Sequence, residues 1–249
     1  MPIFPVERGE IYYEVTGRGH PLLVFAPGFL GSRERAGAPP AAQNPIAALA
    51  RSFRVITVDA RNAGRSWAEI GPDYDWPLYT ADHMALLDAI GAERCHVFGS
   101  SFGVSFALAL AHAEPERVSA LVLQNPVGLS GDNRELIETE IAQWTASLAG
   151  RPDVSPSALK AVGPRMFKRD FVFSLTRNAV GRITAPTLLL PGDDRLHPPL
   201  VSAALARLTR AEVLPRWQDS ERADSVMERV SGFLREHTPG QAMLAGRRS

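Results

Sequence analysis

The segment of this chain best suited to chemistry is Gly99-Ser100-Ser101-Phe102-Gly103, which fits the pattern G-x-S-x-G. It follows the apolar run 95–98 and precedes a helix-like run over 102–113. A sharp turn between a strand and a helix lifts the central serine hydroxyl above the edge of a sheet. The sequence therefore predicts that Ser101 is a nucleophile, and residues without bulk suit positions 99 and 103 because strand and helix approach each other there.

A serine hydroxyl is a weak nucleophile until a neighbouring base removes its proton, and an acid must orient that base. Two carboxylates, Asp193 and Asp194, follow the apolar run 187–190. The residues after the earlier run 121–123 are Gln124 and Asn125, so that place offers no carboxylate. The acid is therefore expected after 187–190, although an aspartate that only closes a strand-to-helix turn is the alternative.

The elements around these residues follow one order along the chain. Short apolar runs bounded by turn residues alternate with longer segments of helical pattern. Continuous apolar runs are typical of parallel strands buried on both faces, and their alternation with helices indicates a three-layer α/β fold with a mostly parallel central sheet. The predicted strands are 22–26, 53–58, 95–98, 121–123 and 187–190, the predicted helices are 45–50, 80–90, 102–113 and 199–208, and an edge hairpin is predicted over 3–6 and 11–15.

One internal segment and the end of the chain fall outside this alternation. Residues 127–182 contain no buried strand run but include an amphipathic stretch over 136–148. They predict a helical lid inserted into a core formed by 1–126 and 183–237. Residues 238–249 are polar, with proline and glycine, and predict a flexible tail.

Composition excludes several kinds of partner. The 249 residues carry 27 basic and 27 acidic side chains, so the formal net charge is zero, whereas nucleic acids and anionic membranes require clustered positive charge. Cys95 is the single cysteine, which excludes an intrachain disulfide. No secretion signal and no run of the ~18 apolar residues that span a bilayer is visible. We expect a cytoplasmic protein that acts on a small molecule, without a metal or a cofactor.

Four segments, taken in order, resemble motifs of the α/β-hydrolase superfamily, and the resemblance extends over about residues 3–234. One is the G-x-S-x-G segment. The resemblance implies an α/β-hydrolase fold and hydrolysis or acyl transfer of a small ester, thioester or lactone through Ser101. The other three segments each follow a predicted strand: Ala26-Pro27-Gly28-Phe29, Asp59-Ala60-Arg61-Asn62-Ala63-Gly64-Arg65-Ser66, and Pro191-Gly192-Asp193-Asp194-Arg195-Leu196-His197-Pro198.

The resemblance also implies an oxyanion hole made of two backbone N–H groups. One belongs to Phe102, directly after the nucleophile, and the other to Phe29. Pro27 stands where relatives usually have a histidine that helps to hold this loop. Residues 61–66 are interpreted as a structural turn rather than a catalytic loop.

The acid and the base are assigned by the same resemblance. Asp194 lies four residues before Pro198, as the acid of the family lies before its proline, and is preferred to its neighbour. The family places the base after the last strand, here in the loop 215–222, which contains no histidine. Arg222 takes that place, but arginine stays protonated at neutral pH and cannot act as a general base. His197, three residues after Asp194, is the other candidate substitute.

The remaining histidines give no obvious base. His20 precedes a strand, at the wrong end of the sheet, and His96 lies within one. His112 and His237 end helices, while His83 lies early in a helix whose start could approach the site but is more typical of a surface residue.

Two functions from different classes therefore remain open. The first is a serine hydrolase with an incomplete triad and a substitute base. The second is a catalytically retired or non-hydrolytic member of the family, either a ligand-binding protein or a cyclase or lyase of small-molecule biosynthesis. In that case Arg222 would stabilise an anionic intermediate.

Overall fold

A computed structural model describes residues 2–25, 45–71, 73–151, 154–167 and 171–240 of the chain. Within these ranges nine strands form one sheet in the order β1-β2-β4-β3-β6-β7-β8-β9, with β5 paired to β2. The strands are β1 (Ile3–Val6), β2 (Gly9–Thr16), β3 (Pro21–Phe25), β4 (Arg54–Val58), β5 (Trp67–Ala68), β6 (Cys95–Ser100), β7 (Val118–Gln124), β8 (Thr187–Leu190) and β9 (Glu212–Val213).

The sheet is antiparallel at one edge and parallel elsewhere. β1 pairs with β2, and β2 with β4, in antiparallel register, whereas β4, β3, β6, β7, β8 and β9 are parallel neighbours. Every residue of β6 and β7 is buried, as expected for strands covered on both faces.

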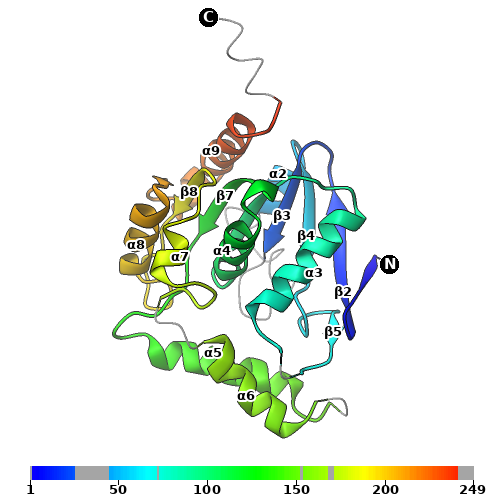
Figure 1. The fold of residues 1–249 in the computed structure, drawn as a ribbon. Helices are drawn as coiled ribbons and strands as arrows, with labels where there is room; N and C mark the ends of the chain where they lie inside the picture. Colours follow the sequence, from blue (N-terminus) through cyan, green and yellow to red (C-terminus); the bar gives the residue numbers. More distant parts are fainter. Residues whose placement is uncertain (1, 26–44, 72, 152–153, 168–170, 241–249) are drawn as a thin grey trace, which may run out of the picture.

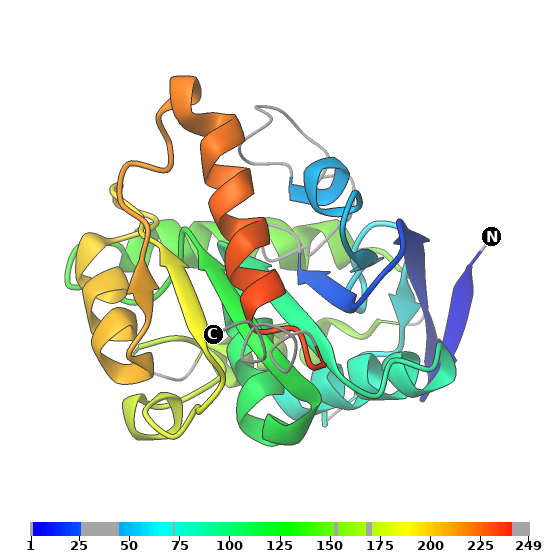
Figure 2. The ribbon, with the colours of Figure 1, turned by 90° about the horizontal axis from the view of Figure 1, so that it is seen from above.

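Helices cover both faces of this sheet (Figure 1, Figure 2). Successive strand residues point to opposite faces. Leu22 and Val24 of β3 therefore pack with α2 (Pro45–Leu49) and α9 (Ala223–Glu236) on one face. Leu23 and Phe25 pack on the other face with α3 (Trp76–Ala89), α4 (Gly103–Ala113) and α8 (Pro199–Thr209). The predicted three-layer α/β fold is thus confirmed. None of the helices in the described ranges is long and apolar enough to cross a bilayer. The helices of eight residues or more are α3 (Trp76–Ala89), α4 (Gly103–Ala113), α5 (Arg134–Leu148), α6 (Pro156–Met166), α8 (Pro199–Thr209) and α9 (Ala223–Glu236), and the short ones are α2 (Pro45–Leu49) and α7 (Arg177–Val180).

Helix α3 begins four residues before its predicted start at residue 80. The Asp75 carboxylate accepts a hydrogen bond from the Trp76 backbone N–H at 2.8 Å, and Pro77 occupies the first turn. An N-terminal aspartate and a first-turn proline both favour a helix start. The apolar spacing alone did not include this turn.

Helices α5 and α6 lie together at the end of the sheet where the parallel strands terminate, apart from the layers that cover its faces (Figure 1). The two helices approach closely at Gly163, where an added Cβ would lie only 3.2 Å from the Ile141 Cγ2 atom. The Trp76 indole N–H donates to the Met166 carbonyl at 2.8 Å, which fastens the end of α6 to the start of α3. α7, which also falls within 127–182, packs instead against α4 and α8.

Thr238, the first residue of the predicted flexible tail over 238–249, packs against the fold. Thr238 is buried, its hydroxyl donates to the Leu234 carbonyl at 2.9 Å, and it lies 3.0 Å from the His96 Nε2 atom. These contacts join Thr238, the first residue of the predicted tail, to α9 and β6. Residues 241–249 lie outside the described ranges.

His96 gives the fold a definite response to acid. The ring has no exposed surface. Burial, reinforced by the nearby rings of His20 and His237, lowers the pKa of His96 from 6.5 to about 3. Between these values the unfolded chain binds the proton and the folded chain does not, so the stability due to neutral His96 is lost as the pH falls below 6.5.

We therefore predict that the free energy of unfolding falls on acidification from pH 6.5, and that His96→Gln makes this dependence shallower by at most ~1.4 kcal/mol per pH unit. Denaturant unfolding at several pH values measures the slope. His112→Gln, at the half-exposed end of α4, is the matched control and should keep the slope of the parent. Equal slopes in parent and His96→Gln would contradict the argument.

Candidate active site

Ser101 lies on a strained turn between β6 and α4. Its backbone φ is 55°, in the left-handed region, which residues with a side chain adopt at a cost and which recurs at functional sites. A Cβ added at Gly99 would lie 2.6 Å from the Gly103 carbonyl oxygen, so α4 can follow this closely only because residue 99 has no side chain. The Ser101 N–H donates to the Gln124 carbonyl on β7 at 2.9 Å and fixes the turn. The turn has the geometry that the sequence motif predicts.

The loop after β8 brings His197 to this serine. The Ser101 Oγ and His197 Nε2 atoms are 3.0 Å apart. The other ring nitrogen, Nδ1, lies 2.8 Å and 3.0 Å from the two Asp194 carboxylate oxygens, and the His197 backbone N–H donates to the same carboxylate at 2.8 Å. Serine, imidazole and carboxylate thus form one continuous hydrogen-bonded chain.

The charge of Asp194 fixes the direction of these bonds. Burial alone would raise the pKa of the carboxyl, but the side-chain and backbone hydrogen bonds from His197 outweigh it, and the pKa is lowered. An ionised carboxylate only accepts hydrogen bonds, so Nδ1 carries the proton. In the neutral ring Nε2 is then the acceptor, and the Ser101 hydroxyl donates to it. This is the arrangement in which imidazole can remove the serine proton.

A glycine lets the loop fold back on itself. A Cβ added at Gly192 would lie 2.3 Å from the His197 carbonyl oxygen and 2.5 Å from its Cβ atom. The Gly192 N–H also donates to the buried Ser202 hydroxyl on α8 at 3.0 Å. Gly192 belongs to the motif 191–198, whose sequence alone gives this glycine no role. The close approach depends on the loop conformation, for which the local sequence carries no signal.

The alternative acid and base lie apart from this chain of contacts. Asp193 is exposed and has no hydrogen-bond partner among the described residues. Arg222 is also exposed at the start of α9, and in the described part of the chain its hydrogen bonds are backbone ones, to Asp219 and Ser225. Of the two substitute bases that the sequence offered, the structure brings His197 to Ser101.

The other histidines lie elsewhere in the fold. His83, predicted as a surface residue, is instead buried between Phe25 and Phe106, and burial lowers its pKa to about 3. The surface expectation is wrong because His83 lies on the buried face of α3, at helical spacing from Tyr79 and Leu86. His20 and His96 pack together, with ring centroids 4.5 Å apart.

Only one half of the predicted oxyanion hole can be located. Phe29 lies outside the described residues. Phe102 is buried at the start of α4, with its backbone N–H directly after the nucleophile. Its ring stacks on Phe173 with centroids 5.4 Å apart and meets the edge of Phe167 at 6.3 Å. These two aromatic residues, which the sequence analysis did not single out, give the surroundings of the turn an apolar wall.

The segment Asp59–Ser66 has the contacts of a structural turn, as interpreted from the sequence. The Asp59 carboxylate accepts from the Arg65 N–H at 3.0 Å, and the Ser66 hydroxyl donates to the Asp59 carbonyl at 2.6 Å. Arg61 forms a buried two-point ion pair with Asp82 of α3, whose second bond measures 2.7 Å. These bonds hold β4 and α3 together and do not involve Ser101.

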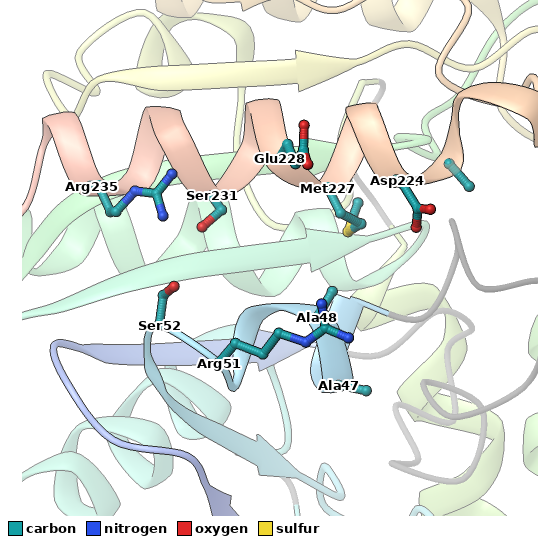
Figure 3. Close-up of a pocket in the computed structure, with 10 residues that line it drawn as sticks. Ala47, Ala48, Arg51, Ser52, Asp224, Met227, Glu228, Ser231 and Arg235 are labelled. Carbon is teal, nitrogen blue, oxygen red and sulfur yellow. The ribbon is translucent and has the colours of Figure 1, made fainter.

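Two cavities differ sharply in character. A mostly apolar pocket of about 350 Å³ lies between α5 and α6, and its wall contains Leu129, Ile137, Ile141, Phe167 and Phe173 together with the charged residues Arg134 and Glu138. A larger groove of about 600 Å³ separates α2 from α9, where charged side chains from its two sides face each other (Figure 3). The groove is lined by none of the hydrogen-bonded site residues. Among the described residues, no group of three or more His, Cys, Asp or Glu side chains is placed to hold a metal ion.

Comparison with known proteins places this chain in a family. A protein named "Putative carbamate hydrolase RutD" from Azorhizobium caulinodans is 36% identical over 125 residues, 50% of this chain and 44% of that protein. The chain thus spans less than half the length of this relative. The 2-hydroxymuconate semialdehyde hydrolase of Pseudomonas sp. is 29% identical over 223 residues, 76% of this chain and 78% of that one.

Solved structures agree in fold. A serine-to-alanine mutant of CumD, a meta-cleavage product hydrolase from Pseudomonas fluorescens, has a TM-score of 0.66 at 21% identity and covers 92% of this chain and 96% of its own. The enol-lactonase from Burkholderia xenovorans has a TM-score of 0.65 at 22% identity, covering 94% and 99%. Identities this low show the fold alone. The family model described as alpha/beta hydrolase fold matches residues 21–153, more than half of the chain, and the protein belongs to that family.

Proposed function

We propose that this protein is a serine hydrolase in which Ser101 is the nucleophile, His197 the general base and Asp194 the group that orients the base. The observation that carries the proposal is the 3.0 Å contact between the Ser101 Oγ and His197 Nε2 atoms, continued to Asp194 at 2.8 Å. A nucleophile and base within hydrogen-bond reach, with the base oriented by a third group, is the arrangement that activates a serine hydroxyl.

The reaction follows from these contacts. The Ser101 oxygen attacks the carbonyl carbon of the substrate while its proton moves to the His197 Nε2 atom. The same proton then passes to the leaving group as the carbonyl–leaving-group bond breaks and an acyl-serine forms. Water next loses a proton to Nε2 and attacks the acyl carbon. The bond between that carbon and the Ser101 oxygen then breaks, the acid leaves, and the proton returns from Nε2 to restore the Ser101 hydroxyl. The Phe102 backbone N–H, directly after the nucleophile, is the donor that meets the developing oxyanion.

The site favours a small substrate with an apolar acyl or aryl part. Phe102 directly follows the nucleophile, its ring packs against Phe167 and Phe173, and these last two residues also line the pocket between α5 and α6. Esters, thioesters and lactones with such an apolar part are suitable substrates for acyl transfer to serine. The named relatives act, by their names, on carbamate and semialdehyde substrates, so these two classes belong in the same substrate panel.

The retired or non-hydrolytic alternative arose from the missing histidine after the last strand and from Pro27 in the early loop. The position of His197 argues against the first of these reasons, since it supplies an imidazole from a different loop. Pro27 lies outside the described residues. Arg222, the residue on which the alternative relied, is exposed and makes only backbone hydrogen bonds in the described part of the chain.

We predict that a fluorophosphonate labels Ser101, and that Ser101→Ala and His197→Ala each lower kcat/KM for a model ester by roughly 10⁴-fold or more. The double variant should lose no more than either single one, because the two residues act as a unit. Asp194→Asn should cost roughly 10²–10⁴-fold. Asp193→Asn and Arg222→Ala are matched controls that should retain parent activity. Full labelling of His197→Ala at the parent rate would refute the assignment of the base.

We further predict that Gly192→Ala slows fluorophosphonate labelling of Ser101 by roughly 10²-fold, because the new Cβ would clash with His197 and misplace its ring. Gly131→Ala is the matched control, since a Cβ there meets nothing within 4 Å. Labelling rates are compared alongside the Tm of each variant. An unchanged labelling rate in a folded Gly192→Ala protein would show that the close approach does not place the base.

A further inference from the structure

The loop that carries Asp194 and His197 must be held at its root. It leaves β8 at Leu190 and enters α8 at Pro199, and the Asp194 side chain in its middle is 54% exposed. An exposed short loop has few contacts of its own to fix a side chain to within the tolerance that catalysis requires.

The root of this loop is bound by two side chains from another loop. The Pro191 carbonyl accepts a hydrogen bond from the Trp217 indole N–H at 2.7 Å and from the Gln218 side-chain N–H at 3.1 Å. Both donors lie in the segment that follows β9. Because a carbonyl oxygen has two lone pairs, these two donors satisfy it fully.

The donors themselves are firmly placed. Trp217 is 1% exposed and packs in the core cluster between the sheet and α9, with Leu188, Leu190 and Val226 among its members. Its loop is tied to the sheet by the Leu214 N–H, which donates to the Leu189 carbonyl at 2.9 Å. A left-handed residue, Arg216 with φ 53°, turns the chain so that the indole points back toward β8. The anchor is therefore part of the core.

We propose that Trp217 and Gln218 are positioning residues that hold the Pro191 carbonyl, and through it the loop that presents His197 to Ser101. This inference rests on the proposed role of His197 as the base. The side-chain hydrogen bonds of Trp217 and Gln218 go to Pro191, so their effect is on where the base lies rather than on the chemistry that it performs.

The test compares Trp217→Phe, Gln218→Leu and the double variant with Trp76→Phe. The last variant removes an indole-to-carbonyl bond of nearly the same length, 2.8 Å, at the end of α6, and so matches the chemical change away from β8. For each protein we would measure kcat and KM with a model ester, the Tm, and the position of the His197 ring in a crystal structure.

We expect Trp217→Phe and the double variant to lower kcat by about 10- to 100-fold with KM unchanged, and to displace or disorder the His197 ring. Gln218→Leu, which alters a half-buried side chain and spares the core, should give a smaller loss of the same kind. Trp76→Phe should lower the Tm without lowering kcat.

A folded double variant with parent kcat and an unmoved His197 ring would overturn the positioning role. If Trp217→Phe does not fold, parent kcat and an unmoved ring in Gln218→Leu count against it in the same way. The proposed function fails differently: Ser101-dependent turnover would then be absent from the parent protein, while the crystallographic position of His197 would still decide whether the anchor places the ring.

Discussion

The left-handed backbone of Ser101 is the constraint on which the rest of the site depends. Holding a residue with a side chain at φ 55° costs of order 1–3 kcal/mol, so the surrounding structure must enforce it. The enforcing contacts are the bond from the Ser101 N–H to Gln124 on the adjacent strand and the bond from the Val104 N–H to the Ser101 carbonyl, which begins α4. Gly99 permits α4 to pass so close above β6. If this turn relaxed, the hydroxyl would leave the sheet edge and the His197 ring would have nothing to meet.

The proposed acid and base lie three residues apart in one loop, and this spacing determines how the acid is held. The Asp194 carboxylate binds both the ring and the backbone N–H of His197, so the acid is satisfied largely by its own loop. Over half of its side chain is exposed, and water therefore screens its charge. The buried pair of Arg61 and Asp82, with side chains 1% and 6% exposed, is the opposite case: a strong, static contact that holds β4 to α3. The proposed site thus relies on geometry more than on a buried charge.

The sequence was sufficient to predict the central strands of the sheet and to name the candidate site residues. It was not sufficient to predict which of these residues lie in contact. Continuous apolar runs predicted the central strands because burial on both faces leaves little choice of residue, and the turn at Ser101 followed from its glycines. α6 was not predicted as an element, since Gly163 and Pro164 interrupt its helical pattern. The choice between Arg222 and His197 could not be made from spacing, because it depends on a loop that folds back over Gly192. The bond from Trp217 to Pro191 joins residues 26 positions apart, and no local pattern encodes it.

The loop after β9 contributes to the proposed site through the neighbouring loop. In the loop 215–222, where Arg222 takes the place of the expected histidine, this chain also has a buried tryptophan, Trp217, whose indole binds the root of the neighbouring loop. Asp194 and His197 both lie beyond that anchor, so a movement of β8 against β9 would carry acid and base together and leave their mutual distance unchanged. The distance that remains sensitive is the one between the loop and β6, across which the Ser101 Oγ and His197 Nε2 atoms meet. A fixed Pro191 carbonyl restrains that distance. The loop after β9 therefore positions the base and does not supply it.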